Sequence, residues 1–163
     1  MNERIKTEIL DIFSKLANSE LLFFELYSVC SKYWIQDAQF WLNIAQDEQH
    51  HVTYVNQMRE LINQFPEQFS QEKPFNPISL ISAGQMAKIV IQKINSSQIN
   101  QEEILNIAFD IEKSILECNY DTMLQTQNER YLQLAHQLVV ESNMHKEMIE
   151  QQIKKTRIAR KTT

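Results

Sequence analysis

The chain has 163 residues, of which 43% are hydrophobic, and a formal net charge of −5; this length and composition suit one domain with a continuous core. Its one glycine and three prolines all lie between Pro66 and Gly84, so the turn residues that a β-sheet protein needs are missing elsewhere. The absence of such turn residues predicts an all-α fold. Acidic and basic residues are scattered instead of gathered in a stripe, which argues against nucleic-acid binding.

The first part of the chain predicts two helices, over residues 3–33 and 38–64. Apolar residues recur in both at the spacing of one helical face. Asp37 stands where the N-cap of the second helix is expected. Because the connection is short, we predict that the two helices pack as antiparallel neighbours. The chain starts with a charged amphipathic segment and contains no apolar run of the ~18 residues that span a membrane, so neither a signal peptide nor a membrane helix is predicted.

Residues 65–78 contain all three prolines and are predicted to be extended. At ~3.3 Å per residue, such a segment reaches about 46 Å, whereas a helix of about 27 residues rises ~40 Å. The connection can therefore run the length of a helical bundle and return the chain to its starting end. The mostly apolar segment 78–94 predicts a shorter helix that lies across or beside the bundle.

The second half predicts two further long helices, over residues 101–126 and 129–157. Asn100, with Glu103 three residues later, matches a capping box at the start of the first of them. The two halves thus repeat as helical hairpins joined by one long crossover. That connectivity is the one of ferritin-like four-helix bundles, in which the second and third long helices are parallel.

Both halves carry the same pattern of polar residues inside their apolar stripes. A lone Glu followed some thirty residues later by Glu-x-x-His, given twice, is the ligand set of a carboxylate-bridged two-metal site in a four-helix bundle. Residues three apart lie on one helix face, so both can reach one ion. The members of the pattern are Glu20, Glu48 and His51 in the first half and Glu112, Ser142 and His145 in the second.

Each of these residues alone has a simpler interpretation. A lone Glu in an apolar stripe is more often an edge residue, and a lone His on such a face is usually a hydrogen-bonded core residue. The coincidence of residue types and offsets in the two halves favours a metal site. Buried carboxylates need a partner, and carboxylate with imidazole suits iron, manganese or zinc better than calcium or magnesium.

Ser142 stands where the repeat requires its second Glu-x-x-His glutamate. The loss of this carboxylate should lower the affinity for the second ion most. Glu141 is an alternative ligand, because it shares a helical face with His145, but it would approach about 100° away from the direction of Ser142. A further alternative is that Ser142 leaves room for water or a small anion.

On these residues the chain resembles the ferritin-like superfamily, nearest to its rubrerythrin and bacterioferritin branch, over nearly its whole length. The resemblance implies one ferritin-like domain over residues 1–163, with a hairpin at about 3–64, a crossover with a short helix at about 65–99 and a hairpin at about 100–158. It implies that the lone Glu residues are terminal ligands, that the Glu of Glu-x-x-His bridges, and that each His caps one ion. The matching motifs are Glu20 with Tyr27, Glu48-x-x-His51 preceded by Phe40-Trp41, Glu112-Lys113 with Ile115 and Glu117, and His145.

If these family roles are transferred to the present chain, the first ion would be held by Glu20, Glu48 and His51. The second would be held by Glu112, Glu48 and His145. Two departures from the family pattern are Ser142 and Asn119, which stands seven residues after Glu112 where the first half has Tyr27.

The resemblance implies a protein that binds one or two iron ions, with manganese and zinc as alternative metals. The implied activity is the oxidation of Fe(II) or the reduction of peroxide or dioxygen. The alternative function is a non-enzymatic binding or interaction module with a degraded or single-ion site. Cys30 and Cys118 do not form a Cys-x-x-Cys motif, so no rubredoxin module is encoded and electrons would come from a separate donor. We expect a cytoplasmic homodimer with no nucleic-acid or membrane partner.

The last helix ends in a basic segment. We interpret it as a solvated helix terminus whose cations complement the helix dipole; the alternative is a contact with an anion, a membrane or a nucleic acid. Its members are Lys154, Lys155, Arg157, Arg160 and Lys161.

Overall fold

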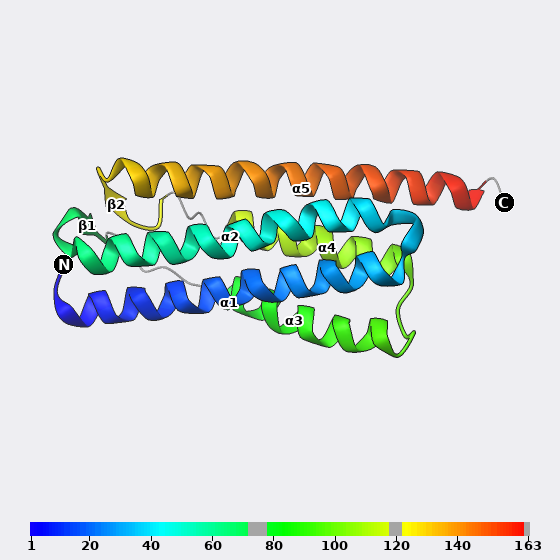
Figure 1. The fold of residues 1–163 in the computed structure, drawn as a ribbon, viewed down its shortest axis with the longest axis horizontal. Coiled ribbons are helices and arrows are strands. Elements are labelled where there is room, and N and C mark those ends of the chain that lie inside the picture. The colour runs from blue at the N-terminus through cyan, green and yellow to red at the C-terminus, as the bar shows by residue number, and fades with distance from the viewer. Residues whose placement is uncertain (72–77, 118–121, 162–163) are drawn as a thin grey trace.

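Long helices run along the longest axis of the molecule in a computed structural model that describes residues 1–71, 78–117 and 122–161 (Figure 1). Helices α1 and α2 form one antiparallel hairpin, α4 and α5 form another, and α2 packs against α5. Helix α2 runs in the same direction as α4 (Figure 1), so the predicted all-α bundle of two hairpins is confirmed. The described helices are α1 (Glu3–Tyr33), α2 (Ala38–Gln64), α3 (Ile78–Asn95), α4 (Gln101–Glu117) and α5 (Glu129–Lys161), with 3₁₀ turns η1 (Ile35–Asp37) and η2 (Pro66–Gln68).

Helix starts follow from local side-chain chemistry. Asn2 accepts a hydrogen bond from the Ile5 N–H at 2.9 Å and so caps α1. The predicted capping box of α4 is confirmed: the Asn100 side chain accepts from the N–H of Glu103 at 3.0 Å, and the Glu103 carboxylate accepts from the N–H of Asn100 at 2.8 Å. These bonds satisfy amide groups that have no partner inside the helix.

Asp37 occupies the N-cap position of α2, as predicted, but makes no capping bond with its side chain. Its carboxylate instead accepts hydrogen bonds from the Gln101 side chain and, at 2.8 Å, from the Gln152 side chain. Partners on α4 and α5 have displaced the local one. Asp37 therefore ties three helices together at one end of the bundle.

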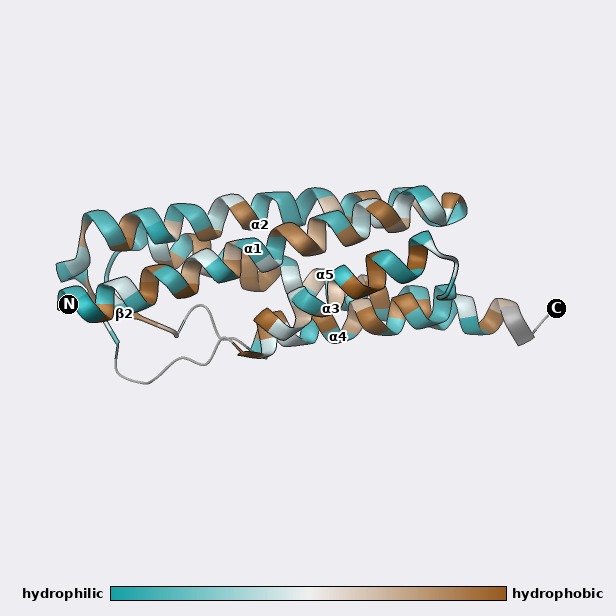
Figure 2. Ribbon diagram, turned by 90° about the horizontal axis from the view of Figure 1, so that it is seen from below, coloured by the Kyte–Doolittle hydropathy of each residue, from teal (hydrophilic) through white to brown (hydrophobic). Residues whose placement is uncertain are grey.

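The crossover differs in part from the extended chain that the prolines predict. Residues 66–68 form η2, and the short strand β1 (Phe69–Ser70) pairs antiparallel with β2 (Gln125–Thr126), while residues 72–77 lie outside the described part. Helix α3 begins near the middle of the bundle and ends where α4 begins (Figures 1 and 2). The return of the chain is thus completed by α3, which packs beside the bundle against α1 and α4.

The third long helix is shorter than the predicted 101–126. Helix α4 ends at Glu117, and residues 122–126 are a turn followed by β2; residues 118–121, with Cys118 and Asn119, lie outside the described residues. Two β-branched threonines, Thr122 and Thr126, lower the helix propensity here. The pairing of β2 with β1 offers the backbone a different set of hydrogen bonds. Helix α5 starts as predicted and continues to Lys161, beyond the predicted end.

The core contains the apolar stripes of the helices, and hydrophobic and hydrophilic residues alternate along each of them (Figure 2). Its largest buried side chains include Tyr27, Trp41 and Tyr131, and Cys30 is a free, buried thiol. The basic end of α5 extends past the other helices (Figure 1). Among the described residues, no helix is long and apolar enough to cross a membrane.

Gly84, the single glycine of the chain, marks a close approach of α3 to α1. A Cβ atom at this position would lie 2.8 Å from Ser19 Oγ and 3.3 Å from Ser19 Cα. Alanine gains about 1 kcal/mol of helix propensity over glycine, but this clash with a helix backbone costs typically ~1–3 kcal/mol. We expect Gly84→Ala to lower the free energy of unfolding by about 1 kcal/mol net, measured by urea denaturation.

A double-mutant cycle with Ser19→Ala checks this origin, because alanine removes the nearest atom of the clash. The two substitutions should couple favourably. Additive effects would contradict steric contact as the cause.

Candidate metal centre

Polar side chains from all four bundle helices are buried together in the core. Each occupies a position in the apolar stripe of its helix, so packing of the stripe turns it inward. All are fully buried, with at most 1% of the surface exposed. The set comprises Glu20 on α1, Glu48 and His51 on α2, Glu112 on α4, and Ser142 and His145 on α5.

The carboxylate and imidazole groups of this set form two triads. In each triad, one donor atom from every residue lies within 4.8 Å of the others. Glu48 belongs to both triads. The first is Glu20, Glu48 and His51, and the second is Glu48, Glu112 and His145; these are the groupings expected from the sequence.

Glu48 lies between the two imidazoles. Its Oε2 atom is 3.0 Å from His51 Nδ1, and its Oε1 atom is 3.2 Å from His145 Nδ1. The two rings have centroids 5.5 Å apart. A carboxylate that offers one oxygen to each side is placed to bridge two ions.

The two lone glutamates, Glu20 and Glu112, are the third members of the two triads. Glu20 Oε2 lies 3.7 Å from His51 Nδ1, and Glu112 Oε2 lies 3.7 Å from His145 Nδ1. Tyr27 donates a hydrogen bond to the other oxygen of Glu112 at 2.9 Å, and its ring stacks on Trp41. This bond holds the Glu112 carboxylate in one orientation.

Two further carboxylates contact the outer nitrogens of the imidazoles. Glu141 Oε2 lies 3.1 Å from His51 Nε2, and Asp47 Oδ2 lies 3.1 Å from His145 Nε2. When each Nε2–H donates outward in this way, the Nδ1 lone pair faces the interior and is available to a metal. The pKa of Asp47 and of Glu141 is lowered chiefly by the bond to its histidine.

The position of Glu141 differs from the alternative that the sequence left open. It contacts His51 of the first triad and not His145, because α5 packs against α2 and directs residue 141 across the interface. Asp47 was missed by the sequence analysis. The signal was present, since Asp47 precedes Glu48 as Glu141 precedes Ser142, so the repeat extends one residue further than we read it.

Burial and mutual charge determine the protonation of the metal-free cluster. Burial would lower the pKa of His51 and His145, but their carboxylate neighbours outweigh it and raise both well above the usual range. Burial would raise the pKa of Glu48, but the two imidazoles hold it well below its usual range. Burial also raises the pKa of Glu20 and Glu112, which stand further from the rings.

The residues fit a divalent metal ion. Within the described part of the chain, Glu48 Oε1, Glu112 Oε2 and His145 Nδ1 are buried without a well-aligned hydrogen bond, although Glu48 Oε1 and His145 Nδ1 lie 3.2 Å apart. Buried polar atoms of this kind are rare in folded proteins. They belong to the donor set, carboxylate oxygen and imidazole nitrogen, that suits iron, manganese or zinc.

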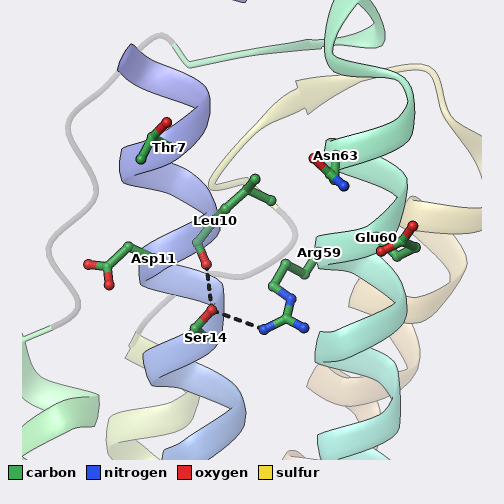
Figure 3. A pocket seen from close by; sticks show the side chains of 7 residues that line it. All are labelled: Thr7, Leu10, Asp11, Ser14, Arg59, Glu60 and Asn63. Carbon is green, nitrogen blue, oxygen red and sulfur yellow. Dashed lines mark hydrogen bonds between the residues drawn. The ribbon is translucent and has the colours of Figure 1, made fainter. Parts of the chain in front are cut away.

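A surface cavity of about 440 Å³ lies between α1 and α2, away from these triads (Figure 3). There the Arg59 guanidinium donates to Ser14 Oγ at 3.0 Å, and Ser14 in turn donates to the Leu10 carbonyl. None of the residues that line this cavity belongs to the buried set. The buried set is therefore the candidate site.

Comparison with protein-family models, with curated proteins and with solved structures finds no match to this chain.

The outer carboxylates are expected to affect the two ions separately. Replacing a group that orients a metal-bound histidine typically costs about 10–100-fold in metal affinity. Glu141→Ala should therefore lower the affinity for the ion at His51 by that factor, and Asp47→Ala should lower the affinity for the ion at His145. A Co(II) titration followed by optical absorption measures both affinities. Glu147→Ala, an exposed carboxylate on α5, is the matched control. Equal loss of both ions in either variant would contradict this assignment.

Metal binding should release protons. Because neighbouring carboxylates raise the pKa of both imidazoles, we expect each ring of the metal-free protein to carry a proton on both nitrogens at neutral pH, and a metal must displace one of them. The apparent affinity is therefore expected to rise as the pH increases from about 6 to 8. Calorimetric titration in buffers of different ionisation enthalpy measures the released protons, and an affinity that is constant over this range would argue against protonated rings.

Proposed function

We propose that this protein is a ferritin-like, rubrerythrin-like metal protein that binds two divalent ions, with iron as the native metal. The observation that carries the proposal is the pair of fully buried triads that share Glu48. Four helices contribute to these triads, and the fold is a bundle of two helical hairpins. Both features match the general plan of di-metal carboxylate bundles.

The first ion would be held by Glu20, Glu48 and His51. The second would be held by Glu48, Glu112 and His145. Iron is favoured over calcium or magnesium because each triad includes an imidazole. Manganese and zinc share this ligand preference and are alternatives to iron.

When bound, a pair of ferrous ions supplies two electrons for the reduction of dioxygen or hydrogen peroxide. The chain contributes a core from which bulk water is excluded, since every member of the triads is buried. Tyr27 holds Glu112, and the outer carboxylates hold the two rings. These contacts orient the ligands before the ions arrive and so reduce the cost of binding.

Anaerobic titration with Fe(II), followed by optical absorption, tests the proposal. We expect saturation at about two irons per chain, followed by oxidation on addition of hydrogen peroxide or dioxygen. Absence of bound iron together with unchanged thermal stability would remove the metal-binding function. Bound iron that neither oxidant changes would remove the enzymatic part alone.

We further propose that the chain forms a homodimer and receives electrons from a separate donor. Helix α3 supports the dimer, because it exposes large apolar side chains: Ile78, Met86 and Ile89 are 65%, 47% and 49% exposed. Sedimentation equilibrium tests the assembly state. A monomer at micromolar concentration would exclude this dimer.

Ser142 favours a second function, a non-enzymatic binding module with a single ion. A serine replaces the carboxylate that would bridge a metal pair, so the second triad is the weaker one. Ser142→Glu distinguishes the two functions. A wild-type stoichiometry of one iron that Ser142→Glu raises to two, with a gain in peroxide turnover, would show that the serine limits the second ion. One iron in both proteins would favour the module.

A further inference from the structure

The residues that α2 and α5 contribute to the cluster are equivalent except at one position. Asp47, Glu48 and His51 on α2 correspond to Glu141, Ser142 and His145 on α5, at a constant offset in the sequence. The equivalence extends to contacts, because the outer carboxylate of each half lies 3.1 Å from the outer nitrogen of the other half's histidine. Ser142 therefore occupies the position from which a second central carboxylate would extend.

The Ser142 hydroxyl is fully buried and has no hydrogen-bond partner among the described residues. Several other serines donate to the carbonyl four residues earlier, as Ser14 does to Leu10 and Ser114 to Asp110. Ser142 does not use this common local bond. It shares the inward face of α5 with His145, so a donor that lacks an acceptor faces the cluster.

Charge points to the kind of acceptor. Two divalent ions bring four positive charges, whereas the carboxylates of the triads, Glu20, Glu48 and Glu112, bring three negative ones, and neutral imidazoles add none. Asp47 and Glu141 are also negative, but they contact the outer nitrogens of the rings and their side chains are 43% and 21% exposed to solvent. One positive charge is therefore unmatched among the buried groups that reach the ions, which is costly. A monoanion restores neutrality.

Size points in the same direction. The serine oxygen stands where a glutamate has its γ-carbon, so the atoms that the substitution removes are those of a carboxylate group. A carboxylate bound there would have the size of the group that the serine lacks, and it would accept the hydrogen bond of Ser142. Hydrogen bonds to charged groups are stronger than neutral ones.

We propose that a small monocarboxylate of the size of formate binds beside Ser142 and takes the place of the missing bridging carboxylate between the two ions. This inference rests on the proposed function, because the anion is held by the bound ions together with the serine. It assigns to this chain an anion site at the core of the cluster. The ligand, and not the protein, then determines whether the second ion is retained.

Metal titration in two salts tests the inference with formate as the probe. Wild-type protein is titrated with Co(II) in sodium formate and in sodium chloride of equal concentration, and both ions are followed by optical absorption. We expect the affinity for the second ion to be at least about tenfold higher in formate. Infrared difference spectra with ¹³C-formate should show the shifted carboxylate bands of a metal-bound anion.

Three variants connect the effect to Ser142. Ser142→Glu supplies the carboxylate and should make the second ion independent of formate. Ser142→Ala retains the space but removes the donor, so the formate effect should weaken by about tenfold. Asn143→Glu adds the same charge at the next, exposed residue of α5 and should leave the formate effect unchanged. If Ser142→Glu does not fold, Ser142→Ala carries the test.

The outcomes separate this inference from the proposed function. Two ions that bind equally well in both salts would overturn the inference, because hydroxide from water would then complete the site. One ion in both salts would overturn it as well, while leaving a metal protein. No ion in either salt would overturn the proposed function, and the inference with it.

Discussion

Glu48→Gln is expected to abolish binding of both ions, whereas Glu20→Gln and Glu112→Gln should each abolish one. The reason is geometric: Glu48 belongs to both triads and offers one oxygen to each. Glutamine retains the size of the side chain but not its charge. Stoichiometry from Co(II) titration of the three variants measures the effect.

The same substitution should also destabilise the metal-free protein. Glu48 is the carboxylate nearest to the inner nitrogens of both imidazoles, and breaking a buried ion pair costs about 3–5 kcal/mol. Urea denaturation in the presence of a chelator measures this loss. Glu60→Gln, an exposed residue on α2, is the control and should leave both stoichiometry and stability unchanged. A Glu48→Gln variant that retains one ion would show that the triads do not share this residue.

The inward placement of the predicted ligands follows from helical periodicity. Glu20, Glu48 and Glu112 each replace an apolar residue in a stripe, and burial of the stripe carries the carboxylate with it. The internal repeat then indicated which residues would meet, because equivalent positions of two hairpins lie at equal heights. The pattern of residues along each helix and the packing of the helices agree here, so the sequence was sufficient to predict which side chains lie together in the core.

Contacts between side chains of different helices were harder to predict from the sequence. The partner of Glu141 depends on the rotation of α5 relative to α2, which spacing within one helix does not determine. The sequence therefore offered Glu141 as an alternative ligand beside His145, whereas it contacts His51. Asp37 shows the same limit, since its capping bond was displaced by Gln101 and Gln152 from distant helices. Local chemistry predicted the position of each residue but not its partner.

Divalent metal is expected to raise the melting temperature of the wild-type protein substantially. An ion that binds only the folded state stabilises it by about 2.7–4.1 kcal/mol at 100–1,000 times its dissociation constant. For a chain of this size, each kcal/mol corresponds to about 2–4 °C, so we expect a shift of roughly 5–16 °C with Co(II) or Zn(II). Thermal denaturation followed by circular dichroism measures it, and a chelator should reverse it.

The change of this temperature shift with the kind of metal and with substitution of Glu48 shows whether the shift comes from ions bound in the triads. Magnesium and calcium should produce a much smaller one, because each triad provides an imidazole nitrogen where these ions prefer oxygen. Glu48→Gln should abolish the shift, since no triad remains. A shift that survives Glu48→Gln would come from surface carboxylates. No shift in the wild type would mean that the buried charges satisfy one another as ion pairs, so that the fold retains the ligand arrangement of a metal protein without its metal.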